Sequence, residues 1–149
     1  MTKVLLVLHA AAAIVLIGSA THGAVLAVRN LLGRPPRPKL QRLYASVTGV
    51  AYLACFALGL LIYPPFRVDV RAAYFDPEVP LATGFFEVKE HWLGVGRLAL
   101  FAFWPMSRRV DLRARTPEVW LFSMLALTLA LVVWFGTFTG LGLVALRPV

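Results

Sequence analysis

Four apolar stretches, each long enough to cross a lipid bilayer, limit the possible folds of this chain more than any other feature of the sequence. A membrane-spanning helix needs about 20 predominantly apolar residues. Stretches of this kind cover approximately residues 4–28, 43–63, 82–106 and 119–146, and the segments between them are short. We therefore predict an all-α integral membrane protein in which residues 1–149 form a single four-helix bundle with four transmembrane spans and short loops.

Composition and charge also favour a membrane protein. Hydrophobic residues make up 60% of the chain and charged residues only 15%, whereas soluble domains are roughly half apolar and about a quarter charged. The net charge of +8 would suggest nucleic acid as a partner of a soluble protein, but here the basic residues cluster between the apolar stretches. Such clusters are typical of cytoplasmic loops that attract anionic lipid headgroups. We expect the lipid bilayer as a partner, and no nucleic acid.

The distribution of basic residues predicts how the chain is oriented in the membrane. Residues 29–42 hold five basic residues, no acidic ones and three prolines, and residues 107–117 hold four arginines. The segment 66–80 carries mixed charges instead. By the positive-inside rule, the first and third loops are cytoplasmic, while the second loop and both termini lie on the outer, periplasmic side. A composition rich in Arg, Ala and Leu indicates a bacterial inner membrane.

Prolines and small residues predict where the helices end and where they pack closely. The second span should end at the Pro-Pro pair at 64–65, because proline cannot continue a helix. Residues 66–80 form either a short extended segment or a helix lying on the surface, since so short a periodicity fits both. The Thr-Pro-Glu sequence at 116–118 predicts the start of the fourth span. Small residues recur at the spacing that lets membrane helices approach closely: Ser19, Gly23 and Ala27.

The third apolar stretch differs from the others because it carries five ionisable residues. Such residues cost roughly a few kcal/mol each in lipid, so they normally face a bundle interior or a wet cavity and mark a functional site. We expect a stripe at helical spacing to turn into the bundle, formed by Glu87, Glu90, Gly94, Arg97, Phe101 and Trp104 with His91 at its edge. Arg97 would then lie at a depth where it can bond to Thr137 of the fourth span.

His9 and His91 should lie at similar depths near the outer face, and this placement suggests a b-type haem. Two neutral imidazoles from different helices of a bundle can hold haem iron, and nearby basic side chains can neutralise the haem propionates. The candidate cofactor-binding residues are His9, His91, Arg67, Arg71 and Arg97. The alternative is structural: His91 pairs with Glu87 one turn earlier, and His9 bonds to a neighbouring hydroxyl.

A second site hypothesis is a metal ion held by His9, His91 and Glu87, a carboxylate-and-imidazole set suited to zinc, copper or non-haem iron. No spacing in the sequence matches a known metal-binding motif, which weakens this hypothesis. Cys55 is the only cysteine, and this excludes cysteine-ligated clusters and an intrachain disulfide. Arg97 either fixes the helix register as a buried donor or contacts a cofactor, a quinone or a proton path with Glu90.

Three classes of function stay open, and no pattern in the sequence identifies catalytic residues or decides whether the protein is an enzyme. The first class is a small electron-transfer subunit that binds b-type haem or interacts with a quinone near the outer face. The second is a non-catalytic subunit or assembly factor of a larger membrane complex, or a homo-oligomer, with the polar third span docking the partner. The third is a proton or ion path, which the absence of an internal repeat disfavours.

Overall fold

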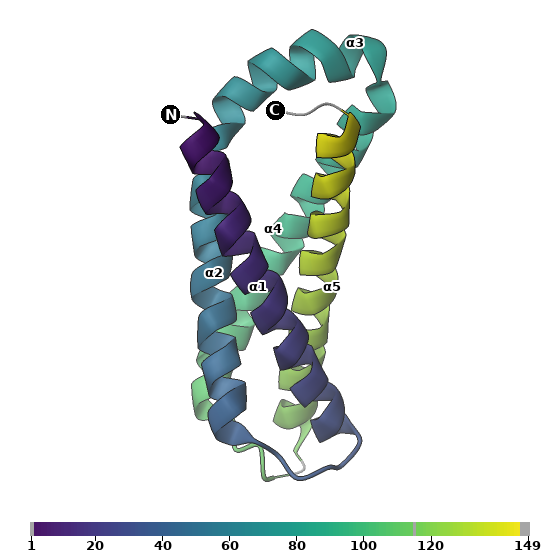
Figure 1. Cartoon of the computed structure of the whole chain (residues 1–149). Coiled ribbons are helices and arrows are strands. Elements are labelled where there is room, and N and C mark those ends of the chain that lie inside the picture. Colours follow the sequence, from purple (N-terminus) through teal and green to yellow (C-terminus); the bar gives the residue numbers. More distant parts are fainter. Residues whose placement is uncertain (1, 115, 147–149) are drawn as a thin grey trace.

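Figure 1 shows four long helices arranged as a bundle, which confirms the predicted all-α fold. The computed structural model describes residues 2–114 and 116–146. The long helices are α1 (Thr2–Leu31), α2 (Pro38–Pro65), α4 (Pro80–Arg109) and α5 (Pro117–Leu146). Within the bundle, α1 packs against α2 and α5, and α4 packs mainly against α5 and less extensively against α2.

Three of the helices are long and apolar enough to cross a membrane: α1, α2 with its continuation, and α5. The fourth, α4, has the same length as α1 and α5, 30 residues each, and runs alongside α5 (Figure 1). Its ionisable residues distinguish it from the other three helices. The protein therefore has the architecture of an integral membrane protein, in which α4 is the polar member of the bundle.

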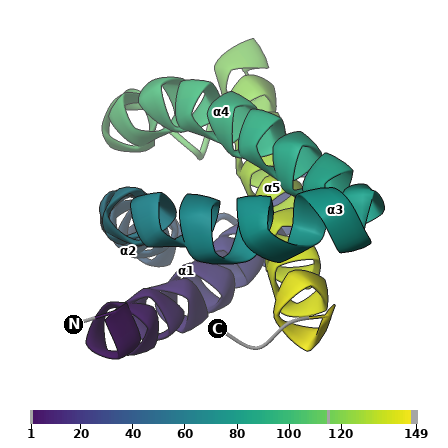
Figure 2. The same ribbon diagram turned by 90° about the horizontal axis from the view of Figure 1, so that it is seen from above.

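The chain stays helical after α2. The π-helix η1 (Phe66–Phe75) and the short turn α3 (Asp76–Glu78) follow directly and lie across one end of the bundle (Figures 1 and 2). Of the two conformations predicted for this segment, the surface-lying helix is therefore confirmed. The prediction that the second span ends at the Pro-Pro pair is also confirmed, since α2 ends at Pro65, but the chain continues beyond the pair as η1 without a break.

The helix type changes at the two prolines. Pro64 and Pro65 lack the N–H that would bond to a carbonyl one turn earlier, and the Phe66 N–H directly after them reaches the carbonyls of both Ile62 and Tyr63. Beyond this junction the Asp76 N–H bonds to Arg71 O, five residues earlier, as in a π-helix. The prolines therefore mark the end of α2 and the start of η1.

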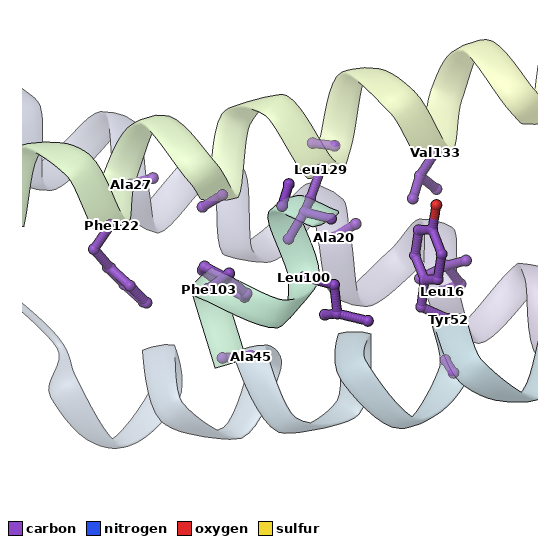
Figure 3. Packing of buried hydrophobic residues seen from close by; sticks show 14 of the residues in the cluster. Leu16, Ala20, Ala27, Ala45, Tyr52, Leu100, Phe103, Phe122, Leu129 and Val133 are labelled. Carbon is purple, nitrogen blue, oxygen red and sulfur yellow. The ribbon is translucent and has the colours of Figure 1, made fainter. Parts of the chain in front are cut away.

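Two hydrophobic cores hold the bundle together, one toward each end. The larger core joins all four long helices toward the end that carries the α1–α2 and α4–α5 loops, which we call the loop end (Figure 3). Its members include Leu16, Ala20, Ala45, Tyr52, Leu100, Phe103, Phe122, Leu129 and Val133. The smaller core lies at the opposite end, which we call the η1 end, where Val70 and Phe75 of η1 cluster with Phe86 of α4 and Leu143 of α5.

The small residues of α1 show close packing at Ser19 but not at Gly23, where an added Cβ would meet no atom within 4 Å. Ser19, Gly23 and Ala27 are all buried. The Thr48 hydroxyl of α2 donates a hydrogen bond of 3.0 Å to Ser19 Oγ, and the Ser19 hydroxyl donates in turn to the carbonyl of Leu16 at 3.1 Å. This chain of bonds satisfies two buried hydroxyls and fixes α1 against α2.

Candidate functional site

Between the two cores lies a zone in which no side chain is fully buried. None of residues 3–15 of α1, 53–65 of α2, 87–95 of α4 and 134–142 of α5 is buried. Within the described residues, α1 and α4 make no close backbone contact, and Figure 1 shows α1 and α2 diverging from α4 and α5 toward the η1 end. We call this zone the interior site and define it by His9, Cys55, Phe56, Gly59, Lys89 and Arg97.

His9 is half-buried on α1 and directs its imidazole toward α2. The ring Cε1 is 3.7 Å from the position that a Cβ would take on Gly59, so this glycine leaves space for the ring. The imidazole bonds to the backbone of Cys55, not to the predicted hydroxyl, and interacts electrostatically with Lys89 of α4. Its Nδ1 is buried and has no hydrogen-bond partner among the described residues. One edge of the imidazole is therefore held by the backbone of Cys55, while the ring nitrogen Nδ1 has no hydrogen-bond partner among the described residues.

Two cations from α4 lie in the same zone. The Arg97 guanidinium lies over the ring of Phe56 on α2, with Cζ 4.3 Å from the ring centroid. The Lys89 ammonium lies 5.2 Å from the ring centroid of Phe86 on its own helix and interacts electrostatically with Glu90. Aromatic faces attract cations, but neither residue forms an ion pair within the described part of the chain. The interior site thus carries two cations that are not held in ion pairs.

The expected bond between Arg97 and Thr137 is not formed. The Thr137 hydroxyl donates instead to the carbonyl of Val133 one turn earlier on α5, at 2.8 Å. A planar guanidinium stacks well on an aromatic ring, and Phe56 offers that ring where α2 faces α4. Arg97 is therefore directed toward α2 and the interior site.

The predicted inward stripe of α4 is wrong for Glu87, Glu90 and Phe101, because apolar side chains occupy most of the packed face of the helix. Gly94, Arg97 and Trp104 of the stripe are half-buried. The other buried or half-buried positions are Ala82, Thr83, Phe86, Lys89, Leu93, Gly96, Ala99, Leu100, Phe103, Met106 and Ser107. Glu87, Glu90, His91 and Phe101 are exposed. Burying Phe86, Leu100 and Phe103 is favourable by roughly 1.5–3 kcal/mol per side chain, whereas burying carboxylates without partners is costly. The helix is therefore rotated so that its acids face outward.

His91 lies on the outward face of α4. Its Nδ1 is 2.7 Å from the carbonyl of Glu87, so the predicted partner residue is correct but the contact is to backbone and not to the carboxylate. Successive residues of a helix are about 100° apart, which places His91 on the side of α4 away from Lys89 and the interior site. The structure thus does not bring His91 to His9. Within the described residues, no three His, Cys, Asp or Glu side chains are grouped to hold a metal ion.

The remaining candidates, Arg67 and Arg71, lie on η1. Arg71 is engaged by two acids: its guanidinium is 2.6 Å from Glu87 Oε1 and 3.6 Å from Asp76 Oδ1. The Thr83 hydroxyl of α4 also donates to Asp76 at 2.6 Å. These bonds fasten η1 to the first turns of α4. Arg67 is exposed.

Four members of the interior site were not predicted from the sequence as site residues: Cys55, Lys89, Phe56 and Gly59. Lys89 was visible as an ionisable residue of the third apolar stretch, but the expected stripe excluded it. Phe56 and Gly59 lie three residues apart on one face of the second span, and such helical spacing indicates a contact face without indicating the contact. Their meeting with His9 and Arg97 depends on the rotation of α4 and the closeness of α1, which periodicity alone does not fix.

Comparisons of the sequence and the fold find no matching protein family, no matching characterised protein and no matching solved structure. The interior site offers one imidazole whose Nδ1 has no hydrogen-bond partner among the described residues, and two cations that form no ion pair there.

Proposed function

We propose that the protein is a small membrane electron-transfer subunit that binds a planar, carboxylate-bearing cofactor of the b-type haem class in the interior site. The observation that carries this proposal is the Nδ1 of His9, which has no hydrogen-bond partner among the described residues, together with two cations that form no ion pair there, Lys89 and Arg97. Haem accepts an imidazole nitrogen at its iron and presents two carboxylates, so it complements both features.

The charge of the interior site supports an anionic ligand. A cation held within a bundle at membrane depth is normally paired with an acid, a carbonyl or a water-filled path. Glu87 is bonded to Arg71 at the η1 end, and Glu90 is exposed and interacts with Lys89 without forming an ion pair. Lys89 and Arg97 would hold the propionates, and His9 would hold the iron. A bound haem would supply one-electron chemistry.

The environment of His9 resembles the way metal-binding histidines are commonly held. Such histidines usually bond their second ring nitrogen to a carbonyl or carboxylate, which fixes the orientation of the ring. The backbone of Cys55 fills that role for His9. Because His91 faces outward, a haem bound here would be held by one histidine, His9, and not by the predicted pair; globins and peroxidases also hold haem through one proximal histidine.

Haem titration of the detergent-purified protein, followed by visible absorption, tests this proposal. His9→Ala should weaken haem binding by at least about tenfold, since even loss of a supporting hydrogen bond to a metal ligand costs about 10–100-fold. His22→Ala is the matched control, because His22 is on the same helix, bonds to Gly18 O at 2.7 Å and stacks on Tyr44. His91→Ala should leave binding unchanged. The proposal is contradicted if the folded, unaltered protein binds no haem, or if the His9→Ala variant binds haem as tightly as the unaltered protein does.

The two cations provide a second comparison in the same titration. Lys89→Gln and Arg97→Gln should each weaken haem binding by about tenfold, because a charge-assisted bond to a propionate is worth roughly 1.5–3 kcal/mol. Arg67→Gln removes an equal charge from exposed η1 and should have no effect. Equal losses in all three variants would mean that the charges act only at long range.

The outward face of α4 supports a second candidate function, a non-catalytic subunit of a larger membrane complex. Glu90 and His91 are exposed there among apolar side chains, with Trp92 48% and Val95 47% exposed. Ionisable groups facing lipid are unfavourable, so a protein partner would be the natural cover. A photoreactive residue at position 90 tests this function by crosslinking. Crosslinks to a larger assembly that disappear in His91→Ala, in a protein that stays colourless, would favour this function over cofactor binding.

A further inference from the structure

The α1–α2 and α4–α5 loops meet at the loop end and form a groove. Its volume is about 570 Å³, and both loops contribute residues to its wall. The polar part of the wall contains Asn30, Arg34 and Arg113, and the apolar part contains Leu32, Leu112 and Trp120. Gly33, with a φ of 69°, lets the first loop turn so that Arg34 lines the groove. The groove is thus polar on one side and apolar on the other.

The polar side of the groove is basic and lacks charge partners. Neither Arg34 nor Arg113 forms an ion pair within the described residues. The nearest acid by sequence, Asp111, accepts the backbone N–H of Arg113 at 3.0 Å. Next to the groove, Arg29 Nε is buried without a partner. The groove therefore presents hydrogen-bond donors and positive charge, a combination that suits an anion with several oxygens.

A second buried donor lies behind the groove. Gln41 is only 2% exposed, and its Oε1 accepts a hydrogen bond of 2.8 Å from Asn30 Nδ2, a residue of the groove wall. The Nε2 of the same side chain is buried and has no partner in the described part of the chain. An unsatisfied buried donor is unfavourable by roughly 1–3 kcal/mol.

We propose that this groove binds the phosphate headgroup of an anionic phospholipid, with Arg34 and Arg113 holding the phosphate and Leu32 and Trp120 contacting the upper acyl chain. The loop end carries most of the positive charge of the chain, which attracts anionic headgroups. Leu32 and Trp120 are 66% and 58% exposed, and tryptophan is favoured at the headgroup level of a bilayer. This inference is independent of the interior site, which lies in the opposite half of the bundle.

The apolar half of the groove distinguishes a lipid from free phosphate. A site for a soluble anion needs only the donors, whereas the groove continues onto Val119 and Trp120 at the start of α5. α5 is one of the helices long and apolar enough to cross the membrane, so an acyl chain that begins at Trp120 can run along it. The phosphate and the chain of one lipid therefore fit the two sides of the groove.

Fluorescence anisotropy of a labelled phosphatidylglycerol, bound to the detergent-purified protein, tests the proposal. Unlabelled phosphatidylglycerol should displace the probe at least about tenfold more effectively than phosphatidylcholine, since each nearby arginine favours an anionic headgroup by about fivefold. Arg34→Gln/Arg113→Gln should abolish this preference. Lys39→Gln/Arg42→Gln is the matched control, because it removes two charges from exposed positions of the same loop end outside the groove.

Two results would overturn the proposal. Equal loss of binding in both double variants would mean that diffuse charge, not the groove, attracts the lipid. Displacement of the probe by inorganic phosphate as effectively as by phosphatidylglycerol would identify a site for a soluble anion. All four substituted side chains are exposed, so we expect the variants to fold, and circular dichroism verifies this.

Discussion

Gly49 and Gly96 determine how closely α2 and α4 approach each other. A Cβ on Gly49 would lie 2.9 Å from the Trp104 ring, and a Cβ on Gly96 would collide with Tyr52 Oη and lie 2.8 Å from Val132 Cγ1. Tyr52 uses the space at Gly96 to donate a hydrogen bond of 2.8 Å to the carbonyl of Leu93. Because Gly49 and Gly96 have no side chains, α2 and α4 can come into contact. This contact positions α4, and with it Lys89 and Arg97.

We expect Gly96→Ala to destabilise the protein by about 1–3 kcal/mol, the usual range for overpacking a core. The added methyl group must displace Tyr52 or Val132, and it disturbs the hydrogen bond to Leu93. Gly140→Ala is the control, because no atom lies within 4 Å of its Cβ position. Thermal unfolding in detergent measures both variants. Equal stability of the two alanine variants would show that α2 and α4 are not in contact at Gly96.

Individual residues also show where prediction from the sequence fails. The presence of a polar third helix follows directly from its five ionisable residues, and so does its length. The rotation of this helix about its own axis does not follow from the sequence, because charged and apolar residues are spread around the helix and several inward stripes are possible. Phe86, Leu100 and Phe103 decide the rotation by packing in the two cores, and this leaves His91 outside and Lys89 inside.

At the scale of elements, η1 is the segment that joins the two halves of the bundle at the η1 end. It follows α2 without a break, crosses the end of the bundle (Figure 2), and packs on α4 and α5 through Val70 and Phe75. The helical spans, the two polar loops and the start of α5 at Pro117 all follow from apolar length, prolines and charge. The course of η1 does not follow from these features, because two consecutive prolines normally indicate the end of a helix.

Arg71→Ala should loosen η1 without unfolding the bundle. The substitution removes the bonds to Glu87 and Asp76, and exposed ion pairs contribute roughly 0.2–1 kcal/mol each. We expect hydrogen exchange in residues 66–79 to become up to about fivefold faster, while exchange in the loop-end core stays unchanged. Arg67→Ala, on the same helix but exposed, is the control. Unchanged exchange in Arg71→Ala, or faster exchange throughout the protein, would contradict the role of Arg71 as a local fastening.

At the scale of the whole molecule, charge is strongly asymmetric between the two ends. Residues 29–42 and 107–118 contain nine basic and two acidic residues, whereas the rest of the chain contains six basic and five acidic residues. The fold brings these two basic segments together at the loop end, as the four-span topology requires (Figure 1). The positive-inside rule predicts that the loop end faces the cytoplasm and that η1 faces outward.

Cysteine labelling tests this orientation. In a Cys55→Ser background, Arg67→Cys on η1 and Arg108→Cys at the loop end replace exposed side chains at opposite ends of the bundle. A membrane-impermeant maleimide should label position 67 in intact cells with a permeabilised outer membrane, and position 108 only in inverted vesicles. Labelling of both positions from the same side would contradict the orientation and the four-span arrangement together.

The central claim is that the interior site holds a ligand between the two cores, and native mass spectrometry of the protein extracted from its own membrane tests it most directly. We predict a non-covalent adduct with the mass of a haem-class cofactor that is present in the unaltered protein and in His22→Ala. The adduct should be lost in His9→Ala and reduced in Lys89→Gln, while lipid adducts persist in every variant. A folded protein that carries lipid but no such adduct, or an adduct that survives His9→Ala, would contradict the claim.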